Sequence, residues 1–464
     1  MRLTTLTLGL AFAAAGACPL SAQDISGTWS GEAALKPDSG LPVSVRIKLE
    51  RDGNGVRLLF SLPESRLVDL ALPSPYSDSS SVTYRDGRLR AEFTPDIGLG
   101  ILSRIGPRDQ ERIVLEGSVM GDSIVGSVRI TTYLSPIVLH REPQRNTEPA
   151  IRFASARDSL PLGGKLVLPQ SRGPHPAAIF VTGSDPDTRD AWLSEARQLA
   201  ARGIASLLYD KRGVGESAGA SHDLASWDDL AGDVEGAVAY LRGRPDLIDT
   251  GRIGLIGQSQ GTWIVAKVAA NDPGIRFVVS ISGSGISAAE QETYRTGALM
   301  AAAGFGPVDI ERARAFQRQK FAVAKTGLGW TALDSAMQKL RADSVRWFPG
   351  YGTGAATRNL ATLRLYGVLQ FNYDPYRDLS RIQVPVLMIM GERDLVFPPQ
   401  VVIDRARAAL VSGGNTLFQD VIIPDASHGL GVLQTYRGKP FRRGAISPVF
   451  LRILVEWVSQ ATAR

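Results

Sequence analysis

From about residue 151 onward, short apolar runs alternate with helical stretches, and this alternation constrains the fold more than any other feature of the chain. These runs are almost continuously apolar, without alternating polar residues, and this pattern is typical of strands buried on both faces. Strands and helices in alternation imply a mainly parallel sheet with helices on both faces. We therefore expect an α/β domain over residues 151–464, with strands at AAIFVTG, IASLLYD, RIGLIGQS, RFVVSISG, PVLMIMGERD and FQDVIIPDASH.

One long interruption separates two of these expected strands. Residues from about 285 to 384 contain no clear strand but several helical segments, including DIERARAFQRQKFAVAK. An insertion of this length between two sheet strands predicts a helical cap over the strand ends. Its basic stretch RARAFQRQK favours a solvated helix face over selection of anionic substrates. Four aromatic residues fit either an acyl pocket or the cap's own small core: Trp330, Trp347, Phe348 and Tyr351.

The N-terminal part of the chain, residues 24–145, has the pattern of antiparallel strands. In VSVRIKLE, apolar residues alternate with polar ones, which is typical of a half-buried strand. Asp-Gly and Gly-Asp pairs between such runs supply the positive φ that tight hairpins need. We expect a small antiparallel barrel or sandwich in which Trp29 plugs one end of the β core. The polar, proline-bearing residues 141–150 are interpreted as a linker.

Residues 1–22 have the order of a secretory signal peptide, with one basic residue, an apolar run and then small residues. The apolar run is too short to span a bilayer, so we expect an extracytoplasmic protein, periplasmic or secreted, without an integral membrane span. Cleavage after Ala22 would remove Cys18, the only cysteine, and with it disulfides, cysteine catalysis and thiolate metal sites. The alternative is a lipoprotein in which Cys18 is lipidated and retained.

Composition excludes some classes of partner. A chain of 464 residues with 44% hydrophobic content can build a large core, and its length favours two or three domains. The formal charge of +6 and the pI of about 9.4 come without a basic block or an aromatic-interleaved stripe. A solvated basic surface is therefore favoured over nucleic-acid binding. The sequence carries no signature of an oligomeric state.

Two serines lie in G-x-S-x-G patterns, and only one of them has the context of a nucleophile. A nucleophile elbow needs a buried strand that ends at the first glycine and a helix that starts directly after the turn. Ser259 meets both demands, because IGLI runs into Gly257 and Gly261 leads into the apolar stretch TWIVAKVAA. Ser217 lies among turn-forming residues, several positions after the nearest strand. We predict that Ser259 is the nucleophile and that Ser217 is a loop residue.

A serine hydroxyl needs a base, and the base needs a carboxylate that orients it. His428 ends the last predicted strand, at the edge where ligands of open α/β sheets bind. Asp394 follows another buried strand, and the order Ser259, Asp394, His428 is that of α/β-hydrolases. Glu392 and Asp425 are the rivals for the acid. The remaining histidines lie in loops or in the β domain: His140, His175 and His222.

An oxyanion hole requires two donors at the place where negative charge develops on the carbonyl oxygen. One expected donor is the backbone N–H of Gln260, the residue after the nucleophile. The second comes from the loop VTGSDPDTRD, where we expect the backbone N–H of Ser184, beside Gly183. These groups require neither a metal ion nor an organic cofactor.

The motifs GPHPAAIFVTGSDPDTRD, YDKRGVGES, GLIGQSQG, GERD and SHG together resemble secreted bacterial α/β-hydrolases of the dienelactone hydrolase and serine-aminopeptidase-like group, a group of esterases. The resemblance runs from about residue 151 to residue 464 and implies the α/β-hydrolase fold. It departs from the family at Thr182, where relatives commonly carry a histidine. It also implies that Asp210 and Arg212 brace the active-site loops.

The implied activity is that of a serine hydrolase that cleaves carboxylic esters through a Ser-His-Asp triad and an acyl-enzyme intermediate. A serine peptidase or acyl-aminopeptidase with the same triad is the enzymatic alternative. A non-catalytic binding protein on a hydrolase scaffold is the third. The expected partner is a small-molecule ester or a short peptide, and the fold alone does not identify it.

Overall fold

The computed structural model describes the chain in the following ranges: 24–33, 43–53, 55–62, 67–72, 80–93, 112–130, 133–142, 147–354, 357–436 and 439–463. Its contacts divide the chain into two compact units, with the main boundary between Glu142 and Pro143. The expected signal peptide, with Cys18 and the cleavage site at Ala22, lies outside the described residues.

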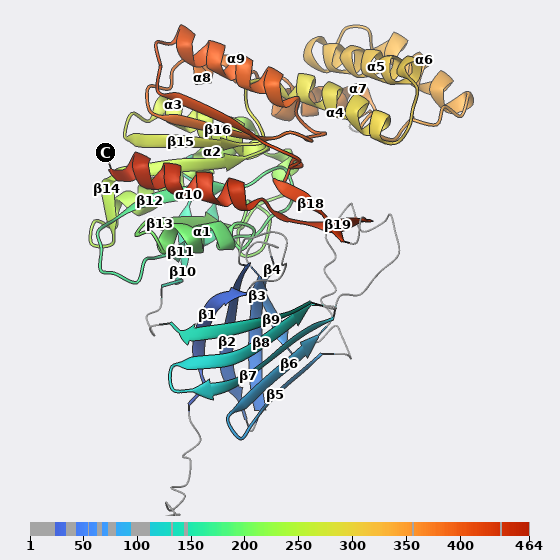
Figure 1. Ribbon diagram of the computed structural model, residues 1–464. Coiled ribbons are helices and arrows are strands. Elements are labelled where there is room, and N and C mark those ends of the chain that lie inside the picture. The colour runs from blue at the N-terminus through green and yellow to red at the C-terminus, as the bar shows by residue number, and fades with distance from the viewer. Residues whose placement is uncertain are drawn as a thin grey trace, which may run out of the picture. The chain divides into compact units, whose positions relative to one another are not determined.

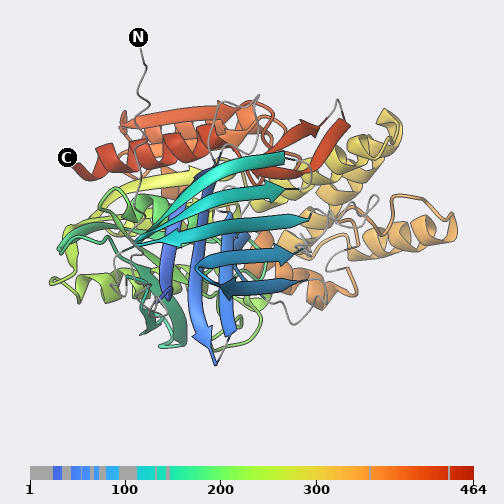
Figure 2. The ribbon, with the colours of Figure 1, turned by 60° about the horizontal axis from the view of Figure 1, so that its bottom comes forward.

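The first unit is built on a nine-stranded sheet among the described residues, in the order β4-β3-β2-β1-β9-β8-β7-β6-β5. Strand β1 pairs antiparallel with β2 and β9, and β5 to β9 pair antiparallel in succession, side by side in Figure 2. This sheet confirms the expected antiparallel β domain. The strands are β1 Gly27–Ala33, β2 Val43–Asp52, β3 Gly55–Leu62, β4 Leu67–Leu72, β5 Ser81–Arg85, β6 Arg88–Phe93, β7 Ile113–Met120, β8 Ser123–Ile130 and β9 Tyr133–Arg141.

Local sequence explains both the turns and the buried face of this sheet. Asp86 and Gly87 connect β5 to β6 with φ values of 50° and 75°, the positive values that a tight two-residue hairpin needs. In β6, Leu89 and Phe93 are buried whereas Arg88 is exposed, so alternate residues face the core. The strand therefore buries every second side chain, which is the alternation that the sequence pattern predicts.

Trp29 lies in the core of the first unit. Its side chain is fully buried, and its indole N–H donates to the carbonyl oxygen of Ile25 at 3.1 Å. The guanidinium of Arg141 lies 4.1 Å from the centre of the indole ring, on its face. Burial of the ring with a partner for its N–H agrees with the expected structural role of this tryptophan.

The second unit is built on an eight-stranded sheet, among the described residues, in the order β10-β11-β13-β12-β14-β15-β16-β17. In this order the strands from β13 to β17 run parallel to one another, and β11 runs antiparallel to both of its neighbours, β10 and β13. This sheet confirms the predicted mainly parallel architecture, to which it adds two strands that the sequence pattern did not indicate. The strands are β10 Ala150–Ala154, β11 Pro161–Val167, β12 His175–Val181, β13 Ala205–Tyr209, β14 Ile248–Gln258, β15 Ile275–Ile281, β16 Val386–Gly391 and β17 Phe418–Ile423.

Helices cover both faces of this sheet (Figure 1). Neighbouring residues of β12 point to opposite faces, because Ile179 packs in one hydrophobic cluster and Phe180 in the other. The first cluster takes in side chains from α2, α3 and α9, and the second takes in side chains from α1 and α10. The five helices are α1 Leu193–Ala200, α2 Trp227–Arg242, α3 Gln260–Asn271, α9 Pro399–Ser412 and α10 Pro448–Ala463.

A helical insertion separates β15 from β16, as the sequence predicts. It has its own hydrophobic cluster, which contains Trp347 and Phe348 and against which Trp330 and Tyr351 pack. These four aromatic residues therefore belong to the cap's own core, and this favours that interpretation over an acyl pocket. The insertion comprises α4 Ala288–Ala302, α5 Pro307–Thr326, α6 Trp330–Ala342, α7 Leu360–Tyr366, the π-helical segment η4 Gly367–Phe371 and α8 Tyr376–Leu379.

A two-stranded antiparallel hairpin, β18 Gly431–Tyr436 and β19 Lys439–Ile446, precedes α10. The sequence pattern did not indicate this hairpin. Over the ranges that the structure describes, no helix is both long enough and apolar enough to cross a bilayer.

Candidate active site

Ser259 occupies a sharp turn between a buried strand and a helix. It follows the last residue of β14 and precedes the first residue of α3, with φ of 51° and ψ of −118°. A Cβ atom at Gly257 would lie 2.5 Å from the carbonyl oxygen of Gly261, and one at Gly261 would lie 2.1 Å from that of Val181. The turn therefore closes only with glycine at both positions, and it holds the serine in a strained conformation.

Ser217, in the second G-x-S-x-G pattern, has a different environment. Its side chain is buried, its hydroxyl donates to the carbonyl oxygen of Asp210 at 2.6 Å, and the N–H of Gly163 donates to it at 3.0 Å. The contact with Asp210 lies within the turn after β13, and the contact with Gly163 ties this turn to β11. The hydroxyl of Ser217 thus stabilises a turn, as expected of a loop residue.

Asp394 and His428 meet beyond the ends of β16 and β17. Oδ2 of Asp394 lies 2.9 Å from Nδ1 of His428. Oδ1 of Asp394 accepts the backbone N–H groups of Val396 at 2.7 Å and Phe397 at 2.9 Å. The ring of Phe397 stacks on the imidazole, with 5.8 Å between the ring centres. The buried carboxylate is therefore held by the backbone while it orients the histidine through a single oxygen.

The two rival acids are used elsewhere. Glu392 accepts the backbone N–H of Asp425 at 2.9 Å, and the carboxylate of Asp425 pairs with Arg393. Both rival side chains are exposed, whereas Asp394 is 2% exposed. The structure therefore brings Asp394 to His428 and gives the other two carboxylates different partners.

The topology places these groups at one edge of the sheet. Strands β12, β14, β15, β16 and β17 are parallel, so the segments that follow them lie at the same edge. The segments after β14, β16 and β17 carry Ser259, Asp394 and His428. This is the edge at which open α/β sheets bind ligands.

The loop after β12 lies directly beside Ser259. A Cβ atom at Gly183 would lie 3.2 Å from Cβ of Ser259 and 2.6 Å from Oε1 of Gln258. Gln260 is the first residue of α3, so its N–H is one of those that an α-helix leaves without an internal partner. The structure thus places the loop with Gly183 and Ser184, and the N–H of Gln260, next to the serine.

Two side chains that sequence reasoning did not single out hold this loop. Nζ of Lys211 donates to the carbonyl oxygen of Gly183 and, at 3.0 Å, to Oε1 of Gln260. Nε2 of His222 lies 2.9 Å from the carbonyl oxygen of Ser184. The C=O and N–H of a trans peptide point in opposite directions, so Lys211 fixes the N–H of Ser184 on the side away from itself.

Lys211 is 3% exposed, and burial lowers its pKa to about 8. Its sequence context, a lysine in a turn directly after a buried strand, does not distinguish it from a solvated turn residue. The one signal in the sequence was its place in the YDKRGVGES motif. Its contacts come from residues 28 and 49 positions away, which no local pattern encodes.

Asp210 and Arg212 brace the same turn from both sides. The carboxylate of Asp210 accepts the backbone N–H and the guanidinium of Arg189 and also the N–H of Glu216. Burial opposes the charge of Asp210, but the hydrogen bonds from Arg189 hold its pKa below the usual value. The expected bracing role of both residues agrees with these contacts and with those of Arg212.

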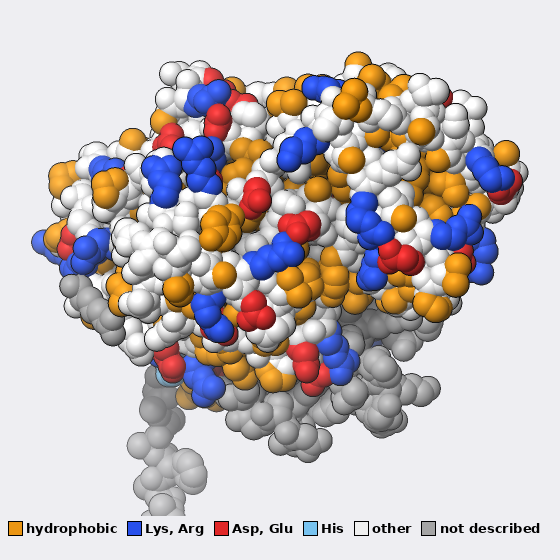
Figure 3. Space-filling view, turned by 90° about the horizontal axis from the view of Figure 1, so that it is seen from above, with side chains coloured by type: hydrophobic (Ala, Val, Ile, Leu, Met, Phe, Trp, Pro, Cys, Tyr) orange, Lys and Arg blue, Asp and Glu red, His pale blue; other side chains and the backbone are white. Residues whose placement is uncertain are grey.

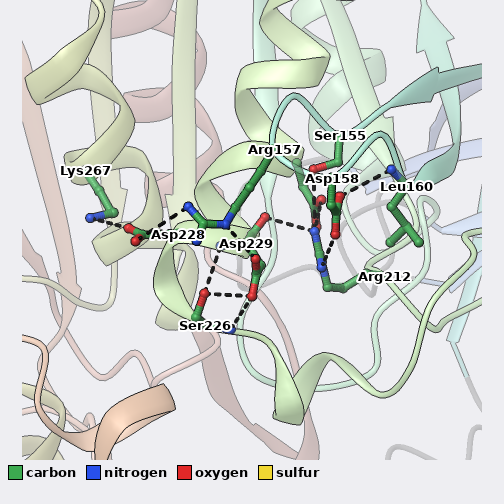
Figure 4. A network of polar contacts seen from close by, with 10 residues as sticks. Ser155, Arg157, Asp158, Leu160, Arg212, Ser226, Asp228, Asp229 and Lys267 are labelled. Carbon is green, nitrogen blue, oxygen red and sulfur yellow. Dashed lines mark hydrogen bonds and ion pairs between the residues drawn. The ribbon is translucent and has the colours of Figure 1, made fainter.

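Arg212 lies in the network of polar contacts that Figure 4 shows. Its guanidinium donates to Asp158 at 3.1 Å, to the carbonyl oxygen of Asp229 at 3.0 Å and to Asp233 at 2.6 Å. These partners tie the turn after β13 to the segment before β11 and to α2. Within the part of the chain that the structure describes, no group of three or more His, Cys, Asp or Glu residues is arranged to hold a metal ion.

The alpha/beta hydrolase family model matches residues 129–437. Because this match covers more than half of the chain, the protein belongs to the alpha/beta hydrolase family. The finer assignment to a dienelactone hydrolase-like group stays a prediction.

The chain is similar to a curated hydrolase, a curated acyltransferase and a solved hydrolase structure. The 2,6-dihydropseudooxynicotine hydrolase of Paenarthrobacter nicotinovorans is 31% identical over 142 residues, 30% of this chain and only 36% of that protein. The acyltransferase drtE of Aspergillus calidoustus is 26% identical over 257 residues, 52% of this chain and 76% of that protein. A solved structure of a 2,6-dihydroxy-pseudo-oxynicotine hydrolase has 17% identity and a TM-score of 0.42, covering 68% of each chain.

Proposed function

We propose that the protein is a serine hydrolase that cleaves carboxylic esters, with Ser259 as nucleophile, His428 as base and Asp394 as the acid that orients the base. The observation that carries the proposal is the 2.9 Å contact between Asp394 and His428, at the sheet edge that also carries the strained Ser259. A serine in such a turn exposes its hydroxyl above the sheet, where a bound carbonyl can be attacked.

In the first half of the reaction, Oγ of Ser259 attacks the ester carbonyl carbon and its proton passes to Nε2 of His428. Asp394 stabilises the imidazolium that forms and keeps the proton of Nδ1 in place. The N–H groups of Gln260 and Ser184 then stabilise the oxyanion of the tetrahedral intermediate. His428 returns the proton to the departing alcohol, which leaves an acyl group on Ser259.

In the second half, water attacks the acyl group while His428 takes the proton of the water. The tetrahedral intermediate uses the same two N–H donors. On its collapse the bond from the acyl carbon to Oγ of Ser259 breaks, His428 returns the proton to Oγ, and the carboxylic acid is released. The residues of this site complete both halves by proton transfer and charge stabilisation.

The proposal is tested with 4-nitrophenyl esters of increasing acyl length beside aminoacyl-4-nitroanilides, using the wild type and Ser259→Ala. We expect ester turnover in the wild type and a loss on the order of 10⁶-fold in the variant, the size seen when a triad nucleophile is removed. Ser217→Ala is the matched control from the second G-x-S-x-G pattern.

The outcomes separate the candidate functions. Turnover of the anilides alone would replace the ester hydrolase by a peptidase. Turnover of neither substrate class would favour a binding protein. Ester turnover that survives in Ser259→Ala but is lost in Ser217→Ala would show that the nucleophile is misassigned.

A further inference from the structure

An open groove of about 520 Å³ runs between α4 and α5 of the cap. The lining residues come from both helices: Ala289, Glu290, Thr293 and Tyr294 from α4, and Glu311, Arg314, Arg318 and Phe321 from α5. Its volume lies in the range of small-molecule sites. Aromatic and aliphatic surface with a few charged groups is the composition that such sites have in general.

Two chains of contacts connect this groove to the candidate active site. The hydroxyl of Tyr294 donates to the backbone carbonyl oxygen of Asp394 at 3.1 Å. The ring of Phe321 packs against that of Phe371, with 4.8 Å between the ring centres. Gln370, next to Phe371, accepts a hydrogen bond from Nε2 of Gln260 at 3.1 Å. The groove is therefore linked to the backbone of the acid through Tyr294 and, through Phe371 and its neighbour Gln370, to the side chain of the residue after the serine.

The charges in the groove leave one cation without a counter-ion. Glu311 pairs with Arg318, and Glu290 pairs with Arg405, each at 2.5 Å. Among the described residues, no carboxylate lies within 4.0 Å of the guanidinium of Arg314. Glu311 interacts with this guanidinium electrostatically, from a greater distance. The lining as a whole is balanced, with Glu290 and Glu311 against Arg314 and Arg318, so the unpaired positive charge is local to Arg314.

Arg314 also differs from its neighbours in the basic stretch RARAFQRQK. A Cβ atom at Gly297 would lie 2.1 Å from Nε of Arg314, so the guanidinium fills the space that the glycine leaves on α4. Arg312 and Arg318 are exposed, as the predicted solvated face requires, whereas Arg314 is half-buried. Basic and acidic side chains are interspersed over the face that Figure 3 shows.

We propose that the groove binds a carboxylate of the substrate, which pairs with Arg314 while the apolar part of the substrate contacts Tyr294 and Phe321. An arginine guanidinium matches a carboxylate with two parallel hydrogen bonds. The substrates are therefore esters that carry a second, free carboxylate beyond the scissile bond. This inference rests on the proposed ester hydrolysis, whose substrate class it names.

The test compares two esters with six-carbon acyl chains, 4-nitrophenyl hexanoate and the mono-4-nitrophenyl ester of adipic acid, which ends in a carboxylate. We expect the wild type to prefer the adipate ester, with a preference that weakens as salt is added. Arg314→Gln should lower the ratio of kcat/KM for adipate over hexanoate by ten- to a hundredfold, the effect of losing a charge-assisted hydrogen bond.

Arg312→Gln is the matched control, because Arg312 lies on the same helix, is exposed and pairs with Asp309. It should leave the ratio at the wild-type value. A ratio that does not change in Arg314→Gln, or that changes as much in Arg312→Gln, overturns the inference. A wild type that hydrolyses hexanoate without preference for adipate also overturns it and leaves the proposed function standing.

Binding measured without turnover separates the two proposals. Calorimetric titration of Ser259→Ala with the adipate ester should give a dissociation constant that rises at least tenfold when Arg314→Gln is added. If the wild type hydrolyses neither ester but this binding difference is found, the anion site stands and the hydrolase proposal fails. If the wild type hydrolyses the hexanoate ester and no binding difference is found, the hydrolase proposal stands and the anion site fails.

Discussion

Asp394 contacts His428 through one carboxylate oxygen only, with 2.9 Å between Oδ2 and Nδ1, and uses the other oxygen to accept two backbone N–H groups. The backbone contacts fix the carboxylate in the turn after β16, so its remaining oxygen has a defined direction toward the imidazole. An ionised carboxylate only accepts hydrogen bonds, so it orients the histidine as an acceptor. An amide in its place would present a donor group as well as an acceptor.

Asp394→Asn should lower kcat by a factor on the order of 10⁴, because an amide can stabilise the wrong tautomer of His428. Glu392→Gln, in the exposed rival acid, should change kcat by less than about twofold. Steady-state hydrolysis of a 4-nitrophenyl ester measures both. Full activity in Asp394→Asn together with a large loss in Glu392→Gln would show that the acid is Glu392.

Ser217→Ala should destabilise the protein without a comparable loss of kcat. The change removes a hydroxyl that donates to Asp210 and accepts from the N–H of Gly163, and it leaves both backbone groups buried without that partner. We expect the free energy of unfolding to fall by about 1–3 kcal/mol. Urea denaturation measures it, and an unchanged midpoint would contradict the role of this hydroxyl in the turn.

Gly261→Ala should disturb the serine turn. The added methyl group would lie 2.1 Å from the carbonyl oxygen of Val181, so β12 and α3 must separate. We expect a loss of about 1–3 kcal/mol in the free energy of unfolding and a lower kcat, because overpacking displaces the backbone. Gly306→Ala is the control, since its φ is −73° and no atom lies within 4 Å of the added methyl group. Equal effects of the two substitutions would be evidence against the close approach.

Lys211→Met should change how stability depends on pH. Burial lowers the pKa of Lys211 from 10.5 to about 8, so between these pH values the unfolded chain binds more protons than the folded chain. The contribution of Lys211 to the free energy of unfolding therefore rises with pH across this window, by on the order of 3 kcal/mol, and is lost as the pH falls through 8.

Urea denaturation of the wild type and Lys211→Met at several pH values from 7 to 11 measures this contribution. The free energy of unfolding of the wild type should increase relative to that of Lys211→Met as the pH rises. Lys320, whose pKa burial also lowers to about 8, is present in both proteins and cancels in the difference. A difference that is independent of pH would mean that burial does not lower the pKa of Lys211.

The sequence predicted the elements that depend on near neighbours. Apolar runs indicated six of the eight strands of the second sheet, and the Asp-Gly pair indicated the hairpin at Asp86 and Gly87. The glycines around Ser259 indicated the turn because their spacing is a local property of a strand that meets a helix. The strands β10 and β11 were missed because their sequences, AIRFA and PLGGKLV, interrupt the apolar residues with arginine, glycine and lysine.

For the candidate site, the sequence selected Ser259, Asp394 and His428 from their places at the ends of predicted strands, and their catalytic roles stay predictions. Only the tertiary structure decided which carboxylate contacts His428, that Lys211 holds the loop beside Ser259, and that Arg314 has no counter-ion among the residues that the structure describes. The physical reason is the range of the interactions. Periodicity and turn preference act between residues a few positions apart, whereas a hydrogen bond or an ion pair joins residues that only the folded chain brings together.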